Sequence, residues 1–288
     1  MSLFDTKGAL SLKRSERLVD LTHYFLENPR QLTQLSYFMD RYSSSKSTIS
    51  EDMDIVRTIF LAKKIGNLES FSGVNGGVIY QPEIPAEAIY RYVEELAALM
   101  RENNRILPGG YLYLSDILGH PRTLRKIAKI IAHEFQNAKV DVVMTIATKG
   151  ITMAQMTAEL LDVPFVIVRR DPKVTEGATL SVNYMSGSSA RVESMVLSKR
   201  SLSAGQRVLI VDDFMKGGGT LNGMKSLVQE FDCLVAGLSV FVEGPFRGER
   251  PLDDYKSLLR VDSIDLADHS IDVQLGNIFS QGIDLFEK

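Results

Sequence analysis

Residues 208–223 read V-L-I-V-D-D-F-M-K-G-G-G-T-L-N-G, and this stretch decides the fold of the larger part of the chain. The four apolar residues 208–211 are typical of a buried strand in a parallel sheet. Asp212 and Asp213 follow, and glycines 217–219 then lead into an apolar-periodic run that predicts a helix. A glycine-rich turn before a helix presents N–H groups to an anion, and paired carboxylates accept hydrogen bonds from vicinal hydroxyls. The stretch therefore predicts a site for a ribose 5-phosphate.

The same stretch resembles the phosphoribosyl-pyrophosphate (PRPP) motif of the type I phosphoribosyltransferases, in which two acidic residues precede a Thr/Gly-rich loop ending in Gly-Gly-Thr. The resemblance implies that the acidic pair holds the ribose hydroxyls and that residues 216–220 hold the 5-phosphate. The implied contact residues are Asp212, Asp213, Phe214, Met215, Lys216, Gly217, Gly218, Gly219 and Thr220. Lys216-Gly217 stands where the enzymes usually have Ala-Thr. The G-x-x-x-x-G-K-[ST] spacing of a Walker A loop is absent from the stretch.

A second strand-to-helix turn, A-T-K-G, follows the apolar strand predicted over residues 140–146. Lys149 in this turn offers a counter-charge to an anion, and a plain surface turn is the alternative. The turn resembles the loop that holds the pyrophosphate of PRPP in the transferases. The resemblance implies that Thr148, Lys149 and Gly150 contact the ligand.

Residues 171–203 form a polar, Gly/Ser-containing stretch that is too long for a simple connection, which predicts a lid. It resembles the mobile loop of the purine transferases. The resemblance implies that Arg169, Arg170 and Lys173 meet the pyrophosphate oxygens and that Tyr184 and Ser186 close over them. The adenine and xanthine enzymes carry an acidic residue after this tyrosine, whereas here M-S-G-S follows. Because phosphoribosyl transfer needs the proton of the base to be managed, this difference favours a sensor over an enzyme. Tyr111, in the place of the hood over the base, is either a stacking residue or a core aromatic.

The first 82 residues predict a winged helix. Three amphipathic helices are expected over residues 15–27, over 32–42 and from about 44 or 47 onward, with Leu32 in the second and Ile59 in the third on the apolar face. An alternating segment containing Asn75-Gly76 then predicts a hairpin. Pro82 and Pro85 mark the boundary, so the expected domains are 1–82 for DNA binding and 83–288 for effector binding and dimerisation. In the second, strands and helices alternate as in an α/β fold with a doubly wound parallel sheet. The expected strands are 140–146, 164–169, 208–211 and 234–242, and the helices between them are 151–161 and 221–231.

The third helix begins in the polar run S-S-S-K-S-T, residues 43–48. A recognition helix presents its N-terminal residues to the major groove, and the alternative is a capped helix start with solvated serines. The expected DNA contacts are Lys13, Arg14, Arg17, Ser44, Ser45, Lys46, Ser47 and Thr48. Residues 13–50 hold six cations and four anions, a net charge of +2 that is modest for a DNA binder. A dimer would double the phosphate contacts.

Composition excludes several classes of protein. The 288-residue chain is 44% apolar with a net charge of −3, and no apolar run reaches the 18 residues of a membrane span. The N-terminus lacks a signal-peptide pattern, and a lone Cys233 fits a reducing, cytoplasmic location. The four histidines show no metal-ligand spacing, so no metal is expected to be held by the protein alone.

The order of these parts resembles the Gram-positive-type purine operon regulators over nearly the whole chain. The resemblance implies a homodimer that binds operator DNA upstream of purine genes, with PRPP and Mg²⁺ as effector and no catalytic residue. Two alternatives stay open. One is an active purine phosphoribosyltransferase with an accessory N-terminal domain, and the other is a regulator whose anion loops take another phosphate-rich nucleotide, such as a guanosine polyphosphate. Repression and activation are both compatible with the sequence.

Overall fold

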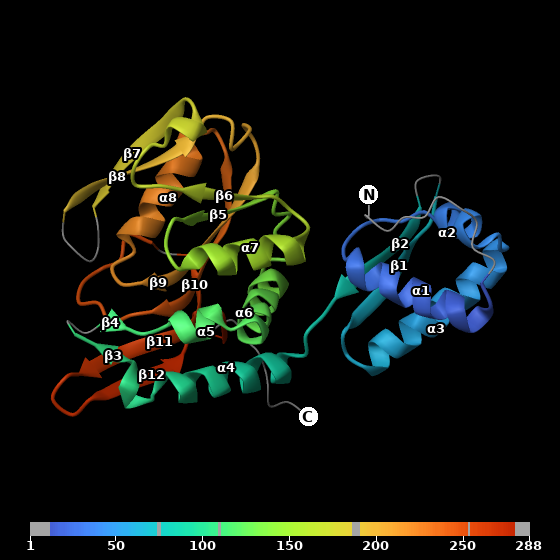
Figure 1. The fold of residues 1–288 in the computed structure, drawn as a ribbon, viewed down its shortest axis with the longest axis horizontal. Helices are drawn as coiled ribbons and strands as arrows, with labels where there is room; N and C mark the ends of the chain where they lie inside the picture. Colours follow the sequence, from blue (N-terminus) through green and yellow to red (C-terminus); the bar gives the residue numbers. More distant parts are fainter. Residues whose placement is uncertain (1–11, 74–75, 109–110, 186–190, 253, 280–288) are drawn as a thin grey trace. The chain divides into compact units, whose positions relative to one another are not determined.

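The computed structural model describes residues 12–73, 76–108, 111–185, 191–252 and 254–279. The chain divides into two compact units, Met1–Pro85 and Ala86–Lys288, which are described separately. Figure 1 shows that the first unit is built mainly of helices and the second around a central sheet. Among the described residues, no helix combines the length and the apolar character needed to cross a membrane.

The first unit has the three helices and the hairpin of a winged helix (Figure 1). Its elements are α1 (Arg14–Glu27), α2 (Leu35–Tyr42), α3 (Lys46–Ala62), β1 (Gly66–Phe71) and β2 (Gly77–Pro82). Strands β1 and β2 pair antiparallel, and an isolated antiparallel bridge joins Thr33 to Val78 of β2. The helices bury an aromatic and aliphatic core against the hairpin. Its fully buried side chains include Leu21, Phe25, Phe38, Ile49 and Phe60.

Two details of the first unit differ from the prediction. Helix α2 begins at Leu35 rather than at residue 32, because Thr33 pairs with Val78 and holds the chain extended there. Leu32, expected to face inward, is 47% exposed for the same reason, and Ile59 is 52% exposed. Asn75, expected in the hairpin turn, lies outside the described residues.

The second unit contains a six-stranded sheet in the order β12-β11-β10-β9-β5-β6. All neighbouring pairs are parallel except β11 and the edge strand β12. The strands are β5 (Val142–Ile146), β6 (Phe165–Val168), β9 (Arg207–Met215), β10 (Leu234–Glu243), β11 (Lys256–Asp265) and β12 (Ser270–Leu275). This mostly parallel α/β sheet confirms the predicted fold class. The last two strands were not predicted.

Helices cover this sheet, and short elements complete the unit. The helices are α4 (Ala86–Met100), α5 (Ser115–Gly119), α6 (Pro121–Glu134), α7 (Gly150–Leu161) and α8 (Gly219–Glu230). Helix α7 packs on β5 and β9, α8 packs on β9 and β10, and α4 packs on β11 and β12. The short elements are η1 (Asn103–Arg105), β3 (Ile106–Leu107), β4 (Tyr111–Leu112), η2 (Val174–Glu176) and η3 (Asn277–Phe279).

The expected long lid loop is in fact a β-hairpin. Strands β7 (Thr179–Met185) and β8 (Val192–Ser198) pair antiparallel along their whole length. A bridge between Arg169 and Val196 ties the hairpin to the end of β6. The hairpin packs on α8, so the segment is ordered on both sides of residues 186–190, which lie outside the described residues.

Candidate functional site

A cleft of about 450 Å³ opens at the carboxyl ends of β5 and β9. Ligands of open α/β sheets bind at this edge of the strands. The residues that line it are Tyr111, Leu112, Leu114, Ile146, Thr148, Lys149, Arg170, Asp212, Asp213, Phe214, Met215, Lys216, Gly217, Gly218, Gly219, Thr220, Leu221, Pro245 and Ile264. The structure thus brings together both predicted anion turns, the acidic pair and Tyr111 of the hood.

The acidic pair is buried at the end of β9, inside the strand rather than after it. Asp212 is 4% exposed and Asp213 is 9% exposed. The Thr148 hydroxyl, from the turn after β5, lies 3.3 Å from Oδ1 of Asp212 and 3.2 Å from Oδ1 of Asp213. Burial, and then the neighbouring charge of Asp213, raises the pKa of Asp212 well above its ordinary value. The pair therefore favours a bound proton, a cation or a ligand hydroxyl between its oxygens.

Gly150 begins α7 next to the acidic pair, and a side chain there would press on the neighbouring side chains. A Cβ atom on Gly150 would lie 3.0 Å from Oδ1 of Asp212 and 3.0 Å from Oγ1 of Thr145. Gly150 itself is buried and does not line the cleft. Its role is to let the first turn of α7 approach the carboxylates.

The glycine turn after β9 has the geometry of an anion site. Gly218 caps α8 with φ +80°, a left-handed conformation that favours glycine, and α8 begins at Gly219. The free N–H groups and positive end of the helix dipole therefore face the cleft. Lys216 is exposed at the start of the turn and adds a full positive charge.

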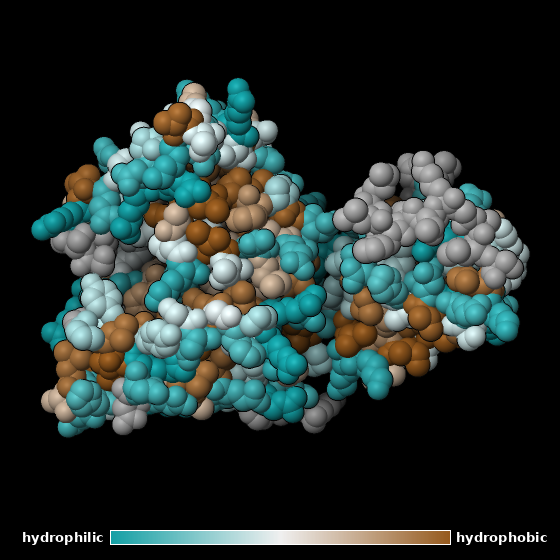
Figure 2. All heavy atoms as spheres, in the orientation of Figure 1, coloured by the Kyte–Doolittle hydropathy of each residue, from teal (hydrophilic) through white to brown (hydrophobic). Residues whose placement is uncertain are grey.

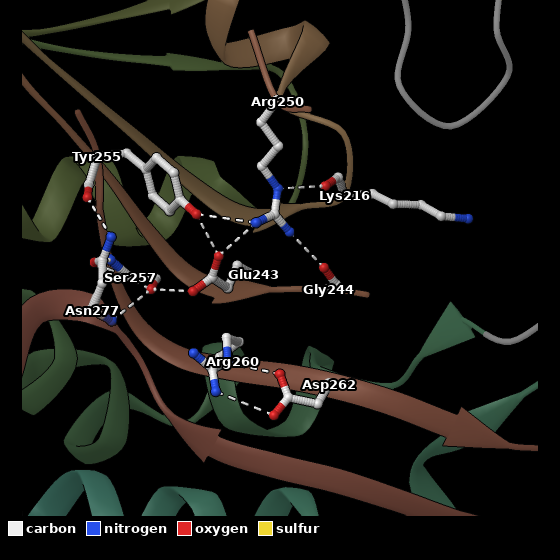
Figure 3. Close-up of polar contacts among 9 residues, drawn as sticks. All are labelled: Lys216, Glu243, Gly244, Arg250, Tyr255, Ser257, Arg260, Asp262 and Asn277. Carbon is white, nitrogen blue, oxygen red and sulfur yellow. Dashed lines mark hydrogen bonds and ion pairs between the residues drawn. The ribbon is translucent and has the colours of Figure 1, made fainter. Parts of the chain in front are cut away.

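A polar network that sequence reasoning missed holds this turn from the other side (Figure 3). Arg250 donates to the carbonyl oxygen of Lys216 at 3.1 Å, to that of Gly244 at 2.8 Å and to Glu243 Oε2 at 2.9 Å. Glu243 ends β10, is 3% exposed, and also accepts hydrogen bonds from Tyr255 and Ser257. Burial, and then the hydrogen bond to Glu243, raises the pKa of Tyr255 to about 12. The side chain of Lys216 extends away from Arg250, so only its backbone is held (Figure 3).

The two lid residues expected at the ligand do not line the cleft. Tyr184 is 6% exposed and packs against α8, where a Cβ on Gly223 would meet its ring at 2.9 Å. Its hydroxyl donates to Glu193 Oε2 at 2.8 Å, and Arg170 pairs with the same oxygen at 3.4 Å. Lys173 is exposed before η2. The hairpin register, which places Glu193 opposite Tyr184, supplies a carboxylate that the sequence around Tyr184 does not show.

In the first unit, two of the expected DNA contacts are committed to holding helix α3. Arg14 Nε donates to Asp52 Oδ1 at 3.1 Å, and Arg17 Nε donates to Asp52 Oδ2 at 2.9 Å. Asp52 is fully buried, and the side chain of Arg17 is only 11% exposed. Arg17 therefore fixes α1 to α3, whereas Arg14, with 56% of its side chain exposed, can also reach outward.

The start of α3 has the geometry of a capped helix with outward-facing polar residues. The Ser45 hydroxyl accepts a hydrogen bond from the Thr48 N–H at 3.3 Å, which satisfies one free donor of the first turn. Ser44 donates to the carbonyl oxygen of Tyr42. Lys46 and Ser47 are exposed, and Lys46 has no ion pair within the described part of the chain. Lys13 is exposed just before α1, where its N–H bonds Glu16.

Comparison with known proteins identifies both units. Residues 13–82 match the family model described as the N-terminal domain of the bacterial purine repressor, and residues 114–275 match the phosphoribosyl transferase domain. The purine biosynthesis transcriptional activator PurR of Lactococcus lactis is 64% identical over 93% of this chain and 99% of its own length. The chain belongs to the PurR family of purine biosynthesis transcriptional regulators.

Membership of this family confirms the resemblance stated above and the prediction that the chain is a transcriptional regulator with a DNA-binding domain. The transcriptional repressor PurR of Bacillus subtilis is 49% identical over 93% of this chain and 94% of its own length. The relatives thus include one named an activator and one named a repressor. Among solved structures, adenine phosphoribosyltransferase from Saccharomyces cerevisiae matches with 22% identity and a TM-score of 0.48, over 54% of this chain and 89% of that chain.

Proposed function

We propose that the cleft of this PurR-family regulator binds PRPP together with Mg²⁺, and that the bound ligand changes the affinity of the first unit for operator DNA of purine genes. The observation that supports this most is the buried acidic pair. It lies between the Thr148 turn and the glycine turn that opens α8. Groups suited to a phosphate and to a diol thus lie side by side at the ends of neighbouring strands.

Each part of PRPP has a chemical counterpart in the cleft. Asp212 and Asp213 can accept hydrogen bonds from the two ribose hydroxyls, since carboxylates are pure acceptors. The N–H groups of residues 217–220 suit the 5-phosphate. Lys149 and Arg170 line the cleft as counter-charges for the pyrophosphate.

The donor set fits a magnesium ion that arrives with the ligand. No cluster of three or more His, Cys, Asp or Glu side chains that could hold a metal occurs in the described residues. Mg²⁺ is commonly bound through one or two carboxylates and substrate phosphates, with waters completing its shell. The acidic pair and the pyrophosphate oxygens supply that combination.

We further propose that the cleft binds PRPP without transferring its phosphoribosyl group. The sequence after Tyr184 lacks the carboxylate of the adenine and xanthine enzymes. Glu193 is held by Tyr184 and Arg170 and does not line the cleft. No carboxylate in the described lid is thus placed to take the proton of a purine base.

The DNA-binding side of the proposal rests on the start of α3. Lys46 and Ser47 are exposed there, beside the capping Ser45. Residues 13–50 carry a net charge of only +2, from six cations and four anions, so we propose that two copies act as a homodimer on two half-sites. Coupling between two such sites is typically about 1–3 kcal/mol, or roughly 5- to 150-fold in affinity.

Isothermal titration of PRPP with Mg²⁺ into the full chain tests the site. We expect Asp212→Asn to weaken binding at least about tenfold, since it removes a charged acceptor worth roughly 1.5–3 kcal/mol. Asp232→Asn is the matched control, because Asp232 is exposed, does not line the cleft and has the positive φ of 54° that asparagine tolerates. Equal PRPP affinity of Asp212→Asn and the wild type would refute the site.

Mobility shifts on purine promoter DNA, with and without PRPP, test the coupling. A DNA affinity that does not respond to saturating PRPP would contradict the effector role. Incubation with PRPP and hypoxanthine, xanthine, guanine or adenine tests the enzymatic alternative, in which nucleotide accumulates steadily. Competition between PRPP and a guanosine polyphosphate for the wild-type cleft identifies the tighter phosphate-rich ligand.

A further inference from the structure

Helix α6 presents a row of four cations to solvent on one face. Arg122, Arg125, Lys126 and Lys129 have the spacing i, i+3, i+4 and i+7, which places them in one stripe, and all four are exposed. We name this stripe the basic face of α6. The opposite side of the helix is apolar and buried. Its members are Leu124, Ile127, Ala128, Ile130, Ile131 and Ala132.

None of the four cations of this face forms an ion pair within the described residues. Lys126 lies over the ring of Tyr92 on α4, 4.2 Å from its centroid. The acidic residue of α6, Glu134, pairs with Lys256 instead. Helix α6 lies between α7 and α4 in the second unit (Figure 1).

On the face in view in Figure 2, the second unit mixes hydrophilic and hydrophobic side chains. A solvated helix face usually mixes both signs of charge, which this stripe does not. A second copy of the chain is a poor partner, because a twofold contact would bring the row against its own like charges. A single small anion would engage only part of a row that spans about 10 Å, at 1.5 Å per residue. The matching partner is a polyanion.

We propose that the basic face of α6 binds the phosphate backbone of DNA beyond the base pairs that α3 contacts. Over about 10 Å, duplex DNA presents roughly six phosphate charges. Residues 13–50 carry a net charge of only +2, so the first unit alone can neutralise few phosphates, and further cations would strengthen DNA binding. This inference rests on the DNA-binding role of the family and not on PRPP as the ligand.

The salt dependence of DNA binding tests the inference in the full chain. Each phosphate contact contributes about −0.9 to the slope of log K against log[salt]. The double variant Arg125→Gln/Lys129→Gln is expected to reduce the size of the slope by about 2 for each copy bound, or about 4 for a homodimer, and to weaken binding at least roughly tenfold at physiological salt, on operator and unrelated duplexes alike. PRPP affinity and melting temperature should stay at wild-type values.

Two matched variants separate a local contact from a general charge effect. Lys199→Gln/Arg200→Gln removes the same charge from an exposed position outside the cleft and should keep the wild-type slope. Arg125→Lys/Lys129→Arg preserves the charge and should also keep it. An equal loss in the Lys199/Arg200 variant, or an unchanged slope in the glutamine variant, would overturn the proposal. Loss of transcriptional control at unchanged DNA affinity would instead assign the face to a protein partner and overturn it as well.

A proximity measurement needs no loss of function. Cys233 is the chain's one cysteine and is buried, so Arg122→Cys supplies a single accessible thiol for an iron-chelate cleavage reagent. Cleavage of DNA flanking the protected operator is the expected result. Absence of cleavage, with operator binding intact, would show that α6 stays away from the duplex.

Discussion

Arg250 donates a hydrogen bond of 3.1 Å from its Nε to the backbone carbonyl of Lys216, 34 residues earlier in the chain. The same guanidinium pairs with Glu243 at 2.9 Å, and Glu243 is buried at the end of β10. The segment after β10 thus fixes the backbone of the glycine turn that faces the cleft. Because an anion site depends on N–H groups that already converge, Arg250 is a positioning residue for the proposed ligand.

Arg250→Lys should weaken PRPP binding several-fold while changing the melting temperature little. A lysine keeps a positive charge for Glu243, but it lacks the planar fork that reaches the carbonyl oxygens of Lys216 and Gly244 at the same time. Titration calorimetry and a thermal melt measure the two effects. Arg260→Lys is the control, since Arg260 pairs with Asp262, two residues along β11, and does not line the cleft. A similar loss of affinity in both variants would contradict the positioning role.

Asp212→Asn should make the protein more stable at neutral pH even as it loses ligand affinity. The pKa of Asp212 is raised in the folded state, chiefly by burial and then by Asp213. Because the folded state binds this proton more tightly than the unfolded state, protonated Asp212 contributes to the free energy of unfolding. This contribution is fully present below the unfolded pKa of about 3.9 and is lost as pH rises through the folded pKa. Asparagine does not titrate, so it avoids this loss.

The pH dependence of the melting temperature checks that sign. The melting temperature of Asp212→Asn should exceed that of the wild type by an amount that grows as pH rises from about 4 toward 8 and vanishes below about pH 4. Each 1 kcal/mol of added stability corresponds to roughly 2–4 °C in melting temperature. Asp232→Asn should show no such trend, because Asp232 is exposed. A difference in melting temperature that grows toward acid pH would show that folding lowers the pKa of Asp212 instead of raising it.

The cleft was predictable because its chemistry is local in sequence. A buried strand, the acidic pair and the glycine turn follow one another over residues 208–220, so their strand-to-helix geometry needs no distant contact. The chain order of the Thr148 turn and this turn then placed them on neighbouring strands. Similar local signals, a helix cap and amphipathic periodicity, made α3 and the winged helix predictable.

The missed features depend on contacts between distant residues or on strand signals that a polar composition obscured. Residues 179–185 alternate Leu180, Val182 and Tyr184 with polar neighbours, a period of two that indicates the strand found there. Its pairing brings Glu193 to Tyr184, which no local pattern shows. Burial of Tyr184 against α8 likewise depends on the hairpin's tertiary placement, so the tyrosine faces the core and not the cleft.

Lys46→Ala should weaken DNA binding and reduce the size of the salt slope by about 1 for each copy bound, as expected for one lost phosphate contact per copy. Lys46 is exposed at the first residue of α3, and alanine is a good helix former, so the helix should stay intact. Fluorescence anisotropy over a salt series measures both quantities. Lys63→Ala, an exposed cation just after the other end of α3, should leave the slope unchanged. A salt slope in Lys46→Ala equal to that of the wild type would show that Lys46 does not contact a phosphate.

Asp52→Asn should unfold or loosen the first unit and abolish DNA binding while leaving PRPP binding in place. Asp52 is fully buried and accepts hydrogen bonds from Arg14 and Arg17, 38 and 35 residues away in the chain. Breaking a buried pair leaves an uncompensated charge on Arg17, whose side chain is 11% exposed, at a cost of about 3–5 kcal/mol. Glu51→Gln is the control, because the Glu51 carboxylate is 70% exposed and its 3.7 Å contact with Arg14 is worth at most about 1 kcal/mol. Amide hydrogen exchange resolves the two units, and protection should fall in α1 and α3 but not in the central sheet. Equal protection of α1 and α3 in the two variants would show that Asp52 does not hold α3 in place.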